Sequence, residues 1–173
     1  AEMSAGTWVP IALTVSGFSG SAAAFVFGIF WIVITLGRLA GGFVVEAIGR
    51  YRTVLLSTLI TAAGILIFML VEVVALPYLG LILWGLGMAM GFPMAVASMS
   101  DDPAKAPHRI NMIITIVYIS SISVGPLLGS LGEIAGIYVA FSIPLALMIV
   151  SAILSPATKP LEIPTVKSEQ KPS

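Results

Sequence analysis

The sequence predicts an all-α fold, a polytopic membrane helix bundle, and three observations support this prediction. Hydrophobic residues occupy 58% of the 173 positions and charged residues 9%, whereas soluble domains have about 45–50% apolar and about 25% charged residues. Apolar runs of the length that crosses about 30 Å of hydrocarbon follow one another along the chain. Lys and Arg occur only in alternate breaks between these runs or near one end of a run. A water-soluble fold of this size could not bury so much apolar surface.

The first run covers residues 1–15 and is too short for a full crossing, so we expect an incomplete helix there. The next run, 21–45, begins after the polar break 16–20, and the run 53–71 follows the charged break 46–52. The remaining spans are expected at 77–99, 110–132 and 137–154, separated by the breaks 100–109 and 133–136.

All these breaks are short enough to join antiparallel neighbours. Residues 1–154 are therefore expected to form one six-helix transmembrane bundle. Residues 155–173 combine several prolines with Lys, Glu and Ser, a composition typical of a disordered tail.

The cations predict how the bundle lies in the membrane. Cytoplasmic loops carry an excess of Lys and Arg. Seven of the eight cations fall in three groups on one side of the bundle: Arg50 and Arg52; Lys105 and Arg109; and Lys159, Lys167 and Lys171. The eighth, Arg38, lies near the same end of its span. We therefore expect a multi-pass protein of the cell membrane whose C-terminus is cytoplasmic.

Charge, cysteine content and motif spacing exclude several classes of function. The net charge of zero gives no basic surface for nucleic acid, and the absence of cysteine excludes disulfides and thiolate metal sites. The glycine-rich stretch 85–91 lacks the spacing of a nucleotide-binding loop. Asp101 and Asp102 are adjacent carboxylates without a second ligand cluster, so we interpret them as helix-end charges. We expect no enzyme activity, no cofactor, no metal site and no nucleic-acid partner.

Three runs carry stripes of small, aromatic and polar residues at helical spacing. Such a stripe has two interpretations: close helix packing through small residues, or the wall of a water-filled path. Both remain open at this point. The stripes are Ala24, Gly28, Trp31, Thr35, Arg38 and Gly42 in the second run, Gly80, Trp84, Gly87, Gly91, Met94 and Ser98 in the fourth, and Asn111, Thr115, Tyr118, Gly125, Gly129 and Gly132 in the fifth.

Charged residues near or inside the spans suggest functional roles. Glu2 is either an acid that accepts a proton or a hydroxyl group, or a solvated residue at the end of a helix. Arg38 either extends to the cytoplasmic headgroups or turns inward to a carboxylate such as Glu46. Glu46 and Arg50 have a favourable helical spacing, and Gly49 can end the helix between them. We interpret this pair as a latch.

Residues 37–52, with G-R-L-A-G followed by G-F-V-V-E-A-I-G-R-Y-R, resemble the loop signature of the major facilitator superfamily. Ala47 and Tyr51 replace basic residues of that signature, as in its second, weaker copy. The chain would then begin inside the seventh helix of a twelve-helix carrier. The opening residues, Phe30-Trp31, and the Gly-Phe-Pro at 91–93 and Gly-Pro at 125–126 are similar to fucose-permease-like sugar symporters. The resemblance covers about residues 1–155.

The resemblance implies a secondary transporter that moves a small, sugar-like solute by alternating access. The first, second, fourth and fifth runs would line its path. The implied substrate contacts are Glu2, Trp31, Trp84, Asn111 and Tyr118, and the implied gate residues are Arg38, Gly42, Glu46, Gly49, Arg50 and Arg52. The implied partners are the lipid bilayer, the solute and a missing N-terminal six-helix half. Two alternatives remain: a truncated, non-transporting fragment or assembly partner, and a six-helix carrier that pairs with itself or with a separate half.

Overall fold

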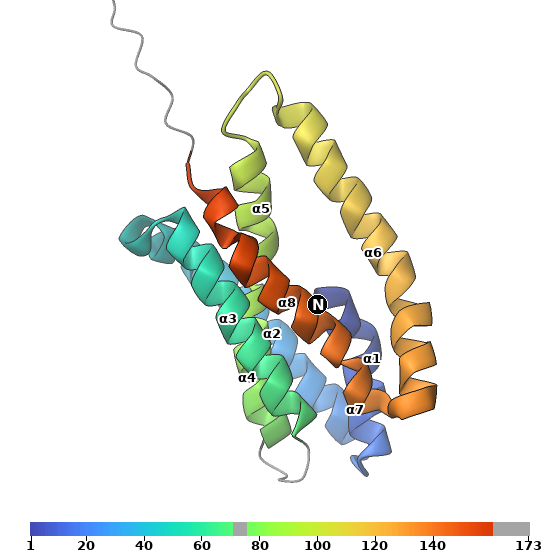
Figure 1. Cartoon of the computed structure of the whole chain (residues 1–173). Coiled ribbons are helices and arrows are strands. Elements are labelled where there is room, and N and C mark those ends of the chain that lie inside the picture. Colours follow the sequence, from blue (N-terminus) through green and yellow to red (C-terminus); the bar gives the residue numbers. More distant parts are fainter. Residues whose placement is uncertain (71–75, 161–173) are drawn as a thin grey trace, which may run out of the picture.

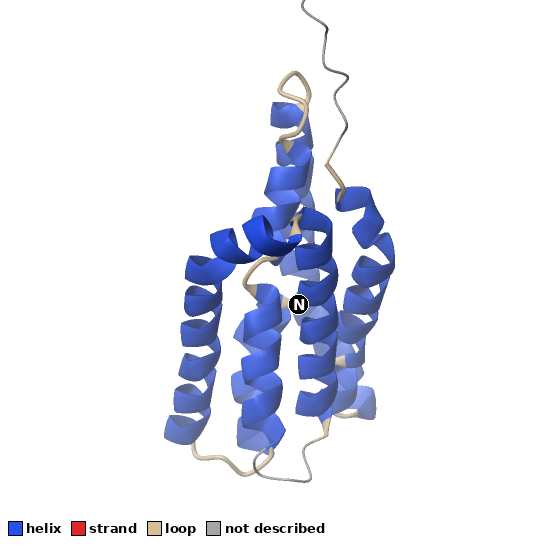
Figure 2. Ribbon diagram, turned by 90° about the vertical axis from the view of Figure 1, so that its left-hand side faces the viewer, coloured by secondary structure: helices blue, strands red, loops and turns tan. Residues whose placement is uncertain are grey.

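The computed structural model describes residues 1–70 and 76–160, which fold into packed helices joined by short loops (Figures 1 and 2). No strand occurs in these two ranges, so the predicted all-α fold class is confirmed. The helices are α1 (Glu2–Val15), α2 (Gly20–Ile48), α3 (Arg50–Met69), α4 (Leu76–Met88), α5 (Gly91–Met99), α6 (Ala106–Ala135), α7 (Ile137–Ala140), α8 (Ser142–Leu154) and the 3₁₀ turn η1 (Ser155–Thr158).

Within residues 1–70 and 76–160, five helical segments have the length and mean hydropathy of a membrane span. Two of them combine shorter helices: α4 and α5 form one segment, and α7, α8 and η1 form another. The shorter α1 has 14 residues. Residues 155–158, predicted as the start of a disordered tail, instead form η1. The rest of the predicted tail from residue 161 onward, and residue 71 at the end of the predicted run 53–71, lie outside the described part of the chain. The five segments are Gly20–Ile48, Arg50–Met69, Leu76–Met99, Ala106–Ala135 and Ile137–Thr158.

Local sequence explains where helices begin and break. The Ser19 side chain accepts a hydrogen bond from the backbone N–H of Ala22 at 3.2 Å, which caps α2. Gly49 has φ +80° and turns the chain directly from α2 into α3, a conformation that favours glycine. The break between α4 and α5 precedes Pro93, which lacks the N–H that would bond to the carbonyl of Ala89.

The closest helix contact joins α3 and α4 through glycines that face each other's backbone. A Cβ atom on Gly64 would lie 2.3 Å from the Trp84 nitrogen, and one on Gly87 would lie 2.5 Å from the Thr61 nitrogen. Side chains larger than hydrogen therefore do not fit at these positions, and the two backbones approach as small residues allow in membrane bundles.

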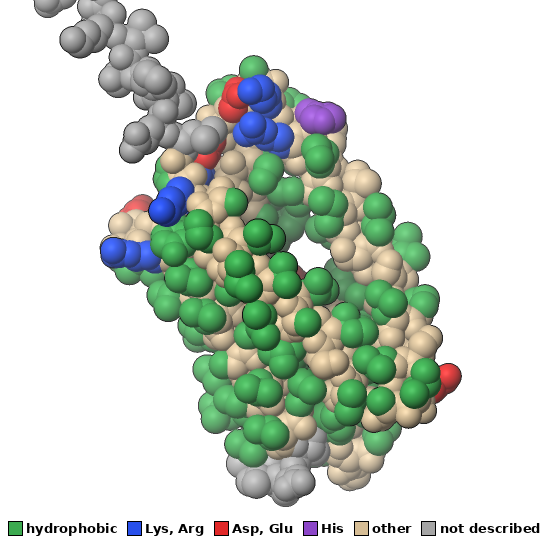
Figure 3. All heavy atoms as spheres, viewed as in Figure 1, with side chains coloured by type: hydrophobic (Ala, Val, Ile, Leu, Met, Phe, Trp, Pro, Cys, Tyr) green, Lys and Arg blue, Asp and Glu red, His purple; other side chains and the backbone are tan. Residues whose placement is uncertain are grey.

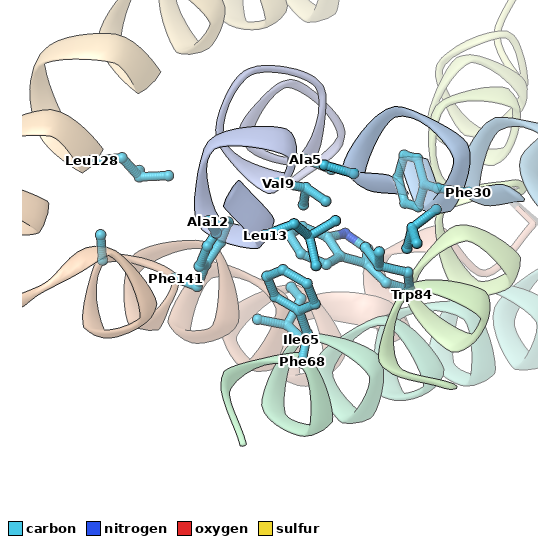
Figure 4. Close-up of a cluster of buried hydrophobic side chains, with 14 of the residues drawn as sticks. Ala5, Val9, Ala12, Leu13, Phe30, Ile65, Phe68, Trp84, Leu128 and Phe141 are labelled. Atoms are coloured by element: carbon cyan, nitrogen blue, oxygen red, sulfur yellow. The ribbon is translucent and has the colours of Figure 1, made fainter. Parts of the chain in front are cut away.

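An aromatic cluster fills the core around Trp84, which has no exposed surface. Its ring lies among Phe30, Phe68 and Phe141, with centroids 6.0, 6.0 and 5.7 Å away and steep interplanar angles (Figure 4). Edge-to-face pairs of this kind add about 0.5–1.5 kcal/mol each beyond the burial of their area. The cluster ties α2, α3, α4 and the last span together.

Helix α6 is the least buried of the five span-length segments in the described residues. Leu128 is its buried residue, and Gly129 lies close to the Trp8 ring of α1. Figure 1 shows α6, in yellow and orange, along one side of the bundle, and Figure 3 shows an opening between it and the other helices. Much of α6 therefore faces cavities or the outside of this chain.

Candidate functional site

A cavity of about 390 Å³ lies between α1, α2, α6 and the junction of α4 with α5. We call it the central pocket. Its wall is largely apolar, with Met88 and Phe92 from α4 and α5 and Val117 from α6. Four polar side chains also line it: Glu2, Arg38, Ser120 and Ser121. The pocket is thus formed by the first, second, fourth and fifth spans.

An ion pair crosses the central pocket from α1 to α2. Arg38 donates from Nη2 to the two carboxylate oxygens of Glu2, at 3.1 and 3.4 Å. The side chains are 42% and 23% exposed, respectively. The sequence predicted that Arg38 either extends to the cytoplasmic headgroups or turns inward to a carboxylate such as Glu46. Arg38 does pair with a carboxylate, but the partner is Glu2 and not Glu46. Glu46 is exposed and forms no ion pair with the described residues.

The predicted stripe on α2 is its open face. Trp31, Thr35 and Arg38 are exposed, whereas the opposite face of the helix, with Phe30 and Ile34, is buried in the core. The Trp31 ring contacts Phe30 edge-on at 5.7 Å between centroids, so the core holds an exposed aromatic surface in place.

The predicted stripe on α6 is also exposed, but its two candidate contact residues lie outside the central pocket. Asn111 lines a shallow hollow with Thr115 and His108, and Tyr118 is exposed one turn further along. The pocket is instead lined by Ser120 and Ser121. By helical spacing in the sequence, Ser121 lies at the edge of the predicted stripe and Ser120 outside it, so the stripe did not select these two adjacent hydroxyls.

The predicted stripe on the fourth span is a packing face. Gly80, Trp84 and Gly87 are buried against α3. Trp84 therefore lies behind the open surface, and it contacts Phe30, which in turn contacts Trp31. Of the five predicted contact residues, the structure places Glu2 in the central pocket, Trp31, Asn111 and Tyr118 on open helix faces, and Trp84 in the core.

A second polar site, which we call the Arg50 cluster, joins three segments at one end of the bundle. Arg50 donates from Nη1 to Asp101 Oδ1 at 2.7 Å and from Nη2 to Asp101 Oδ2. It also donates from Nε to the carbonyl of Thr158 at 2.6 Å and from Nη1 to that of Ala97 at 3.3 Å. One side chain thus connects the start of α3, the end of α5 and η1.

The predicted latch between Glu46 and Arg50 is wrong, because Arg50 has a different acidic partner. Arg50 pairs with Asp101, 51 positions away, which the sequence suggested was a helix-end charge. No spacing rule relates residues at that distance. Gly49 separates the two helices as expected, while Gly42 and Arg52, the other predicted gate residues, are exposed.

An exposed pair near the Arg50 cluster offers a comparison with it. Lys105 and Asp102 lie 3.3 Å apart with 66% and 30% of their side chains exposed. The hydrogen bond from Lys105 lowers the pKa of Asp102 below its usual value. Figure 3 shows Lys and Arg side chains in separate groups over the upper part of this face of the molecule.

Comparison with known proteins agrees with this architecture. The sequence pattern of the Major Facilitator Superfamily matches residues 1–172. An uncharacterized MFS-type transporter of Yersinia pestis is 30% identical over 155 residues, which cover 88% of this chain and 40% of that protein. The chain therefore spans less than half of this relative's length, and no solved structure matches it. The match over nearly all of its length shows that this membrane-spanning chain belongs to the Major Facilitator Superfamily.

Proposed function

We propose that this chain forms the C-terminal six-helix half of a secondary transporter that moves a small, sugar-like solute by alternating access. The observation that carries the proposal is the central pocket, a cavity with an ion pair between the four spans that the resemblance assigned to the path. Charged side chains at membrane depth typically face a cavity and mark a solute or ion pathway. The 40% coverage of the Yersinia pestis relative supports a missing half.

The proposed solute contacts are Glu2 in the pocket and Trp31, Asn111 and Tyr118 on the open faces of α2 and α6. Aromatic faces suit sugar rings, and amide or hydroxyl groups fix their orientation. These open faces are where a second half would complete the site. Trp84 would act as a positioning residue, because it supports Trp31 through Phe30.

The proposed gate is the Arg50 cluster on the cytoplasmic side of the cell membrane, with the C-terminus on that same side. It would hold the ends of α3, α5 and η1 together in one state of the carrier. Gly49 supplies the tight connection to α2, and the open residues Gly42, Glu46 and Arg52 would meet the other half or the lipid headgroups.

Cysteine accessibility provides a direct test, because the chain contains no cysteine. We would place Ser121→Cys in the complete carrier, otherwise freed of cysteine, reconstitute it in vesicles and add a membrane-impermeant maleimide to either side. Ser121 lines the central pocket, so the maleimide should reach it from both sides, with a preference that changes when a transported solute is added.

The matched control is Ser100→Cys, an exposed position in the loop after α5, which should react from the cytoplasmic side only. Reaction of Ser121→Cys from a single side under all conditions, together with no solute-dependent flux, would contradict alternating access. That outcome would instead favour a non-transporting fragment or assembly partner.

A further inference from the structure

We propose that a second cavity of the bundle holds one acyl chain of an anionic phospholipid, with the headgroup of the lipid between Arg109 and Lys159. The cavity, which we call the lateral cavity, has a volume of about 320 Å³ and lies between α3, α4, α5, α6 and α8. Met88, Phe92 and Val117 line both this cavity and the central pocket. A chain in the lateral cavity therefore supports one wall of the central pocket from behind. The proposal goes beyond the transport function and does not depend on it.

The wall of the lateral cavity favours hydrocarbon over water or a polar solute. No charged side chain lines it, and its polar side chains are two serines and three threonines. The threonine hydroxyls already donate to backbone carbonyls of the preceding turn, at distances between 2.7 and 3.0 Å: Thr58, Thr61 and Thr158. A buried water needs about two to four polar partners, and apolar cavities stay dry and bind apolar molecules.

The lateral cavity is accessible to lipid between α6 and α8. These two helices are joined by α7 and diverge from it (Figure 1), and Figure 3 shows the opening between them. All exposed residues of α8 are apolar: Ala146, Leu147, Ile149, Val150, Ile153 and Leu154. An apolar outer surface on a span-length segment contacts the acyl chains of the bilayer. Pockets of about 300–1,000 Å³ hold drug-sized ligands, so this cavity suits one acyl chain and not a whole lipid.

Cations on both sides of the opening select the headgroup. On α6, Arg109 lies one helical turn before Ile113, and it shares a helix face with Ile113 and Val117, which line the cavity. On the other side, Lys159 directly follows Thr158, the lining residue that ends its span-length segment. Neither cation forms an ion pair within the part of the chain that the structure describes. Lys and Arg near the membrane surface attract anionic lipids.

Contacts with α3 hold the Lys159 side of the opening in place. The Lys159 ammonium lies 5.3 Å from the centroid of the Tyr51 ring, and Arg50 Nε donates to the carbonyl of Thr158 at 2.6 Å. A headgroup at Lys159 therefore lies beside the end of the cavity that Thr158 lines, and its acyl chain extends from there between α3 and α8.

Photo-cross-linking in vesicles that hold the complete carrier tests this proposal. The probe is phosphatidylglycerol with a diazirine on one acyl chain, compared with phosphatidylcholine that carries the same chain. We expect phosphatidylglycerol to cross-link to the lining residues Met148 and Ser151, and phosphatidylcholine to do so more weakly. Gly91→Leu should abolish these cross-links, because the nearest neighbour of a Cβ atom there is Met88 Cε at 4.0 Å, which leaves room for the leucine to fill the cavity. The matched control is Gly28→Leu, in open space outside the cavity, which should leave them unchanged.

Two charge variants test the headgroup. Arg109→Gln and Lys159→Gln should each lower the apparent affinity for phosphatidylglycerol at the lining residues about fivefold. Lys105→Gln removes an exposed cation that does not follow a lining residue, and it should change nothing. Cross-links to Ile153, on the outer surface of α8, should persist in every variant and show that the carrier remains folded in the bilayer.

The possible results separate the parts of the proposal. Cross-links that are confined to outward-facing residues such as Ile153, or lining cross-links that survive Gly91→Leu, overturn the lateral cavity as a lipid site. Equal cross-linking by the two lipids, unchanged by Arg109→Gln and Lys159→Gln, overturns the anionic headgroup. Competition by excess oleate but not by unlabelled phosphatidylglycerol overturns the phospholipid in favour of a free fatty acid. None of these readouts involves solute flux, so a failure here is distinct from a failure of the proposed function.

Discussion

Replacing Arg50 by alanine should open the end of the bundle that holds the Arg50 cluster. The substitution removes two hydrogen bonds to Asp101 and one to each of the Thr158 and Ala97 carbonyls. The Arg50 and Asp101 side chains are only 10% and 19% exposed, so solvent screens the pair weakly. Breaking a buried pair costs about 3–5 kcal/mol, and the partial exposure places our expectation near the lower end, about 3 kcal/mol against the closed arrangement.

That free energy corresponds to an increase of about 100-fold in the ratio of open to closed molecules. The assay is the labelling rate of Ser121→Cys by an impermeant maleimide added on the side of the Arg50 cluster, which we propose is cytoplasmic, with Arg50→Ala in the same carrier. The rate follows the open population as long as opening is faster than labelling. Asp101→Asn should act in the same direction with a smaller effect, because it leaves hydrogen-bond acceptors for Arg50.

Lys105→Ala is the control at the same end of the molecule. Its pair with Asp102 is largely exposed, and solvent screens exposed pairs strongly, so the labelling rate should stay close to that of the unchanged carrier. The reasoning is refuted if Arg50→Ala, with its helix content intact by circular dichroism, labels at the same rate as Lys105→Ala.

Three further substitutions test the packing. Gly64→Ala places a Cβ atom 2.3 Å from the backbone nitrogen of Trp84, so it should lower the free energy of unfolding by about 1–3 kcal/mol, measured by circular dichroism during unfolding in detergent. The control is Gly28→Ala, where a Cβ atom would meet nothing within 4 Å, and it should be neutral or stabilising. Gly49→Ala forces φ +80° on a residue with a side chain. The resulting backbone strain of about 1–3 kcal/mol should lower the thermal unfolding midpoint of this variant. Tyr138→Phe removes the hydroxyl that lies 2.5 Å from Ser16 Oγ and 3.0 Å from the carbonyl of Ala12, and the same unfolding assay should show a loss of about 1–2 kcal/mol. A midpoint equal to that of the unchanged chain for Gly64→Ala, Gly49→Ala or Tyr138→Phe would contradict the corresponding contact.

Much of the fold could be predicted from the sequence because a bilayer imposes a length on every span. The run 21–45 lies within α2, and the run 110–132 lies within α6. The ends of helices were harder to predict where no polar break marks them. The helix α2 continues through the charged Glu46 as far as Gly49, because the glycine, and not the charge, allows the chain to turn.

The candidate site was harder to predict because helical spacing identifies a face and not its neighbour. The stripes on α2 and α4 have similar compositions, yet Trp31 lies on an open face and Trp84 in the core. The difference lies in the partner helix: Gly64 of α3 allows close approach to α4, and nothing in the sequence of α4 reports it. Pairs between distant segments, such as Arg50 with Asp101, depend on the same tertiary information.

Helices pack unevenly in this bundle, and this difference relates the Arg50 cluster to the central pocket. The α3–α4 contact is close enough to exclude a single methyl group at Gly64, and Arg50 connects the start of α3 to α5 and η1. These segments form a unit that resists deformation. Helix α6 has Leu128 as its buried residue, yet it presents Ser121 to the central pocket. Segments with few buried contacts open at lower free energy than the core. Opening of the Arg50 cluster should therefore be detectable as a displacement of α6. A small displacement of this helix changes access to the central pocket without disrupting the aromatic core.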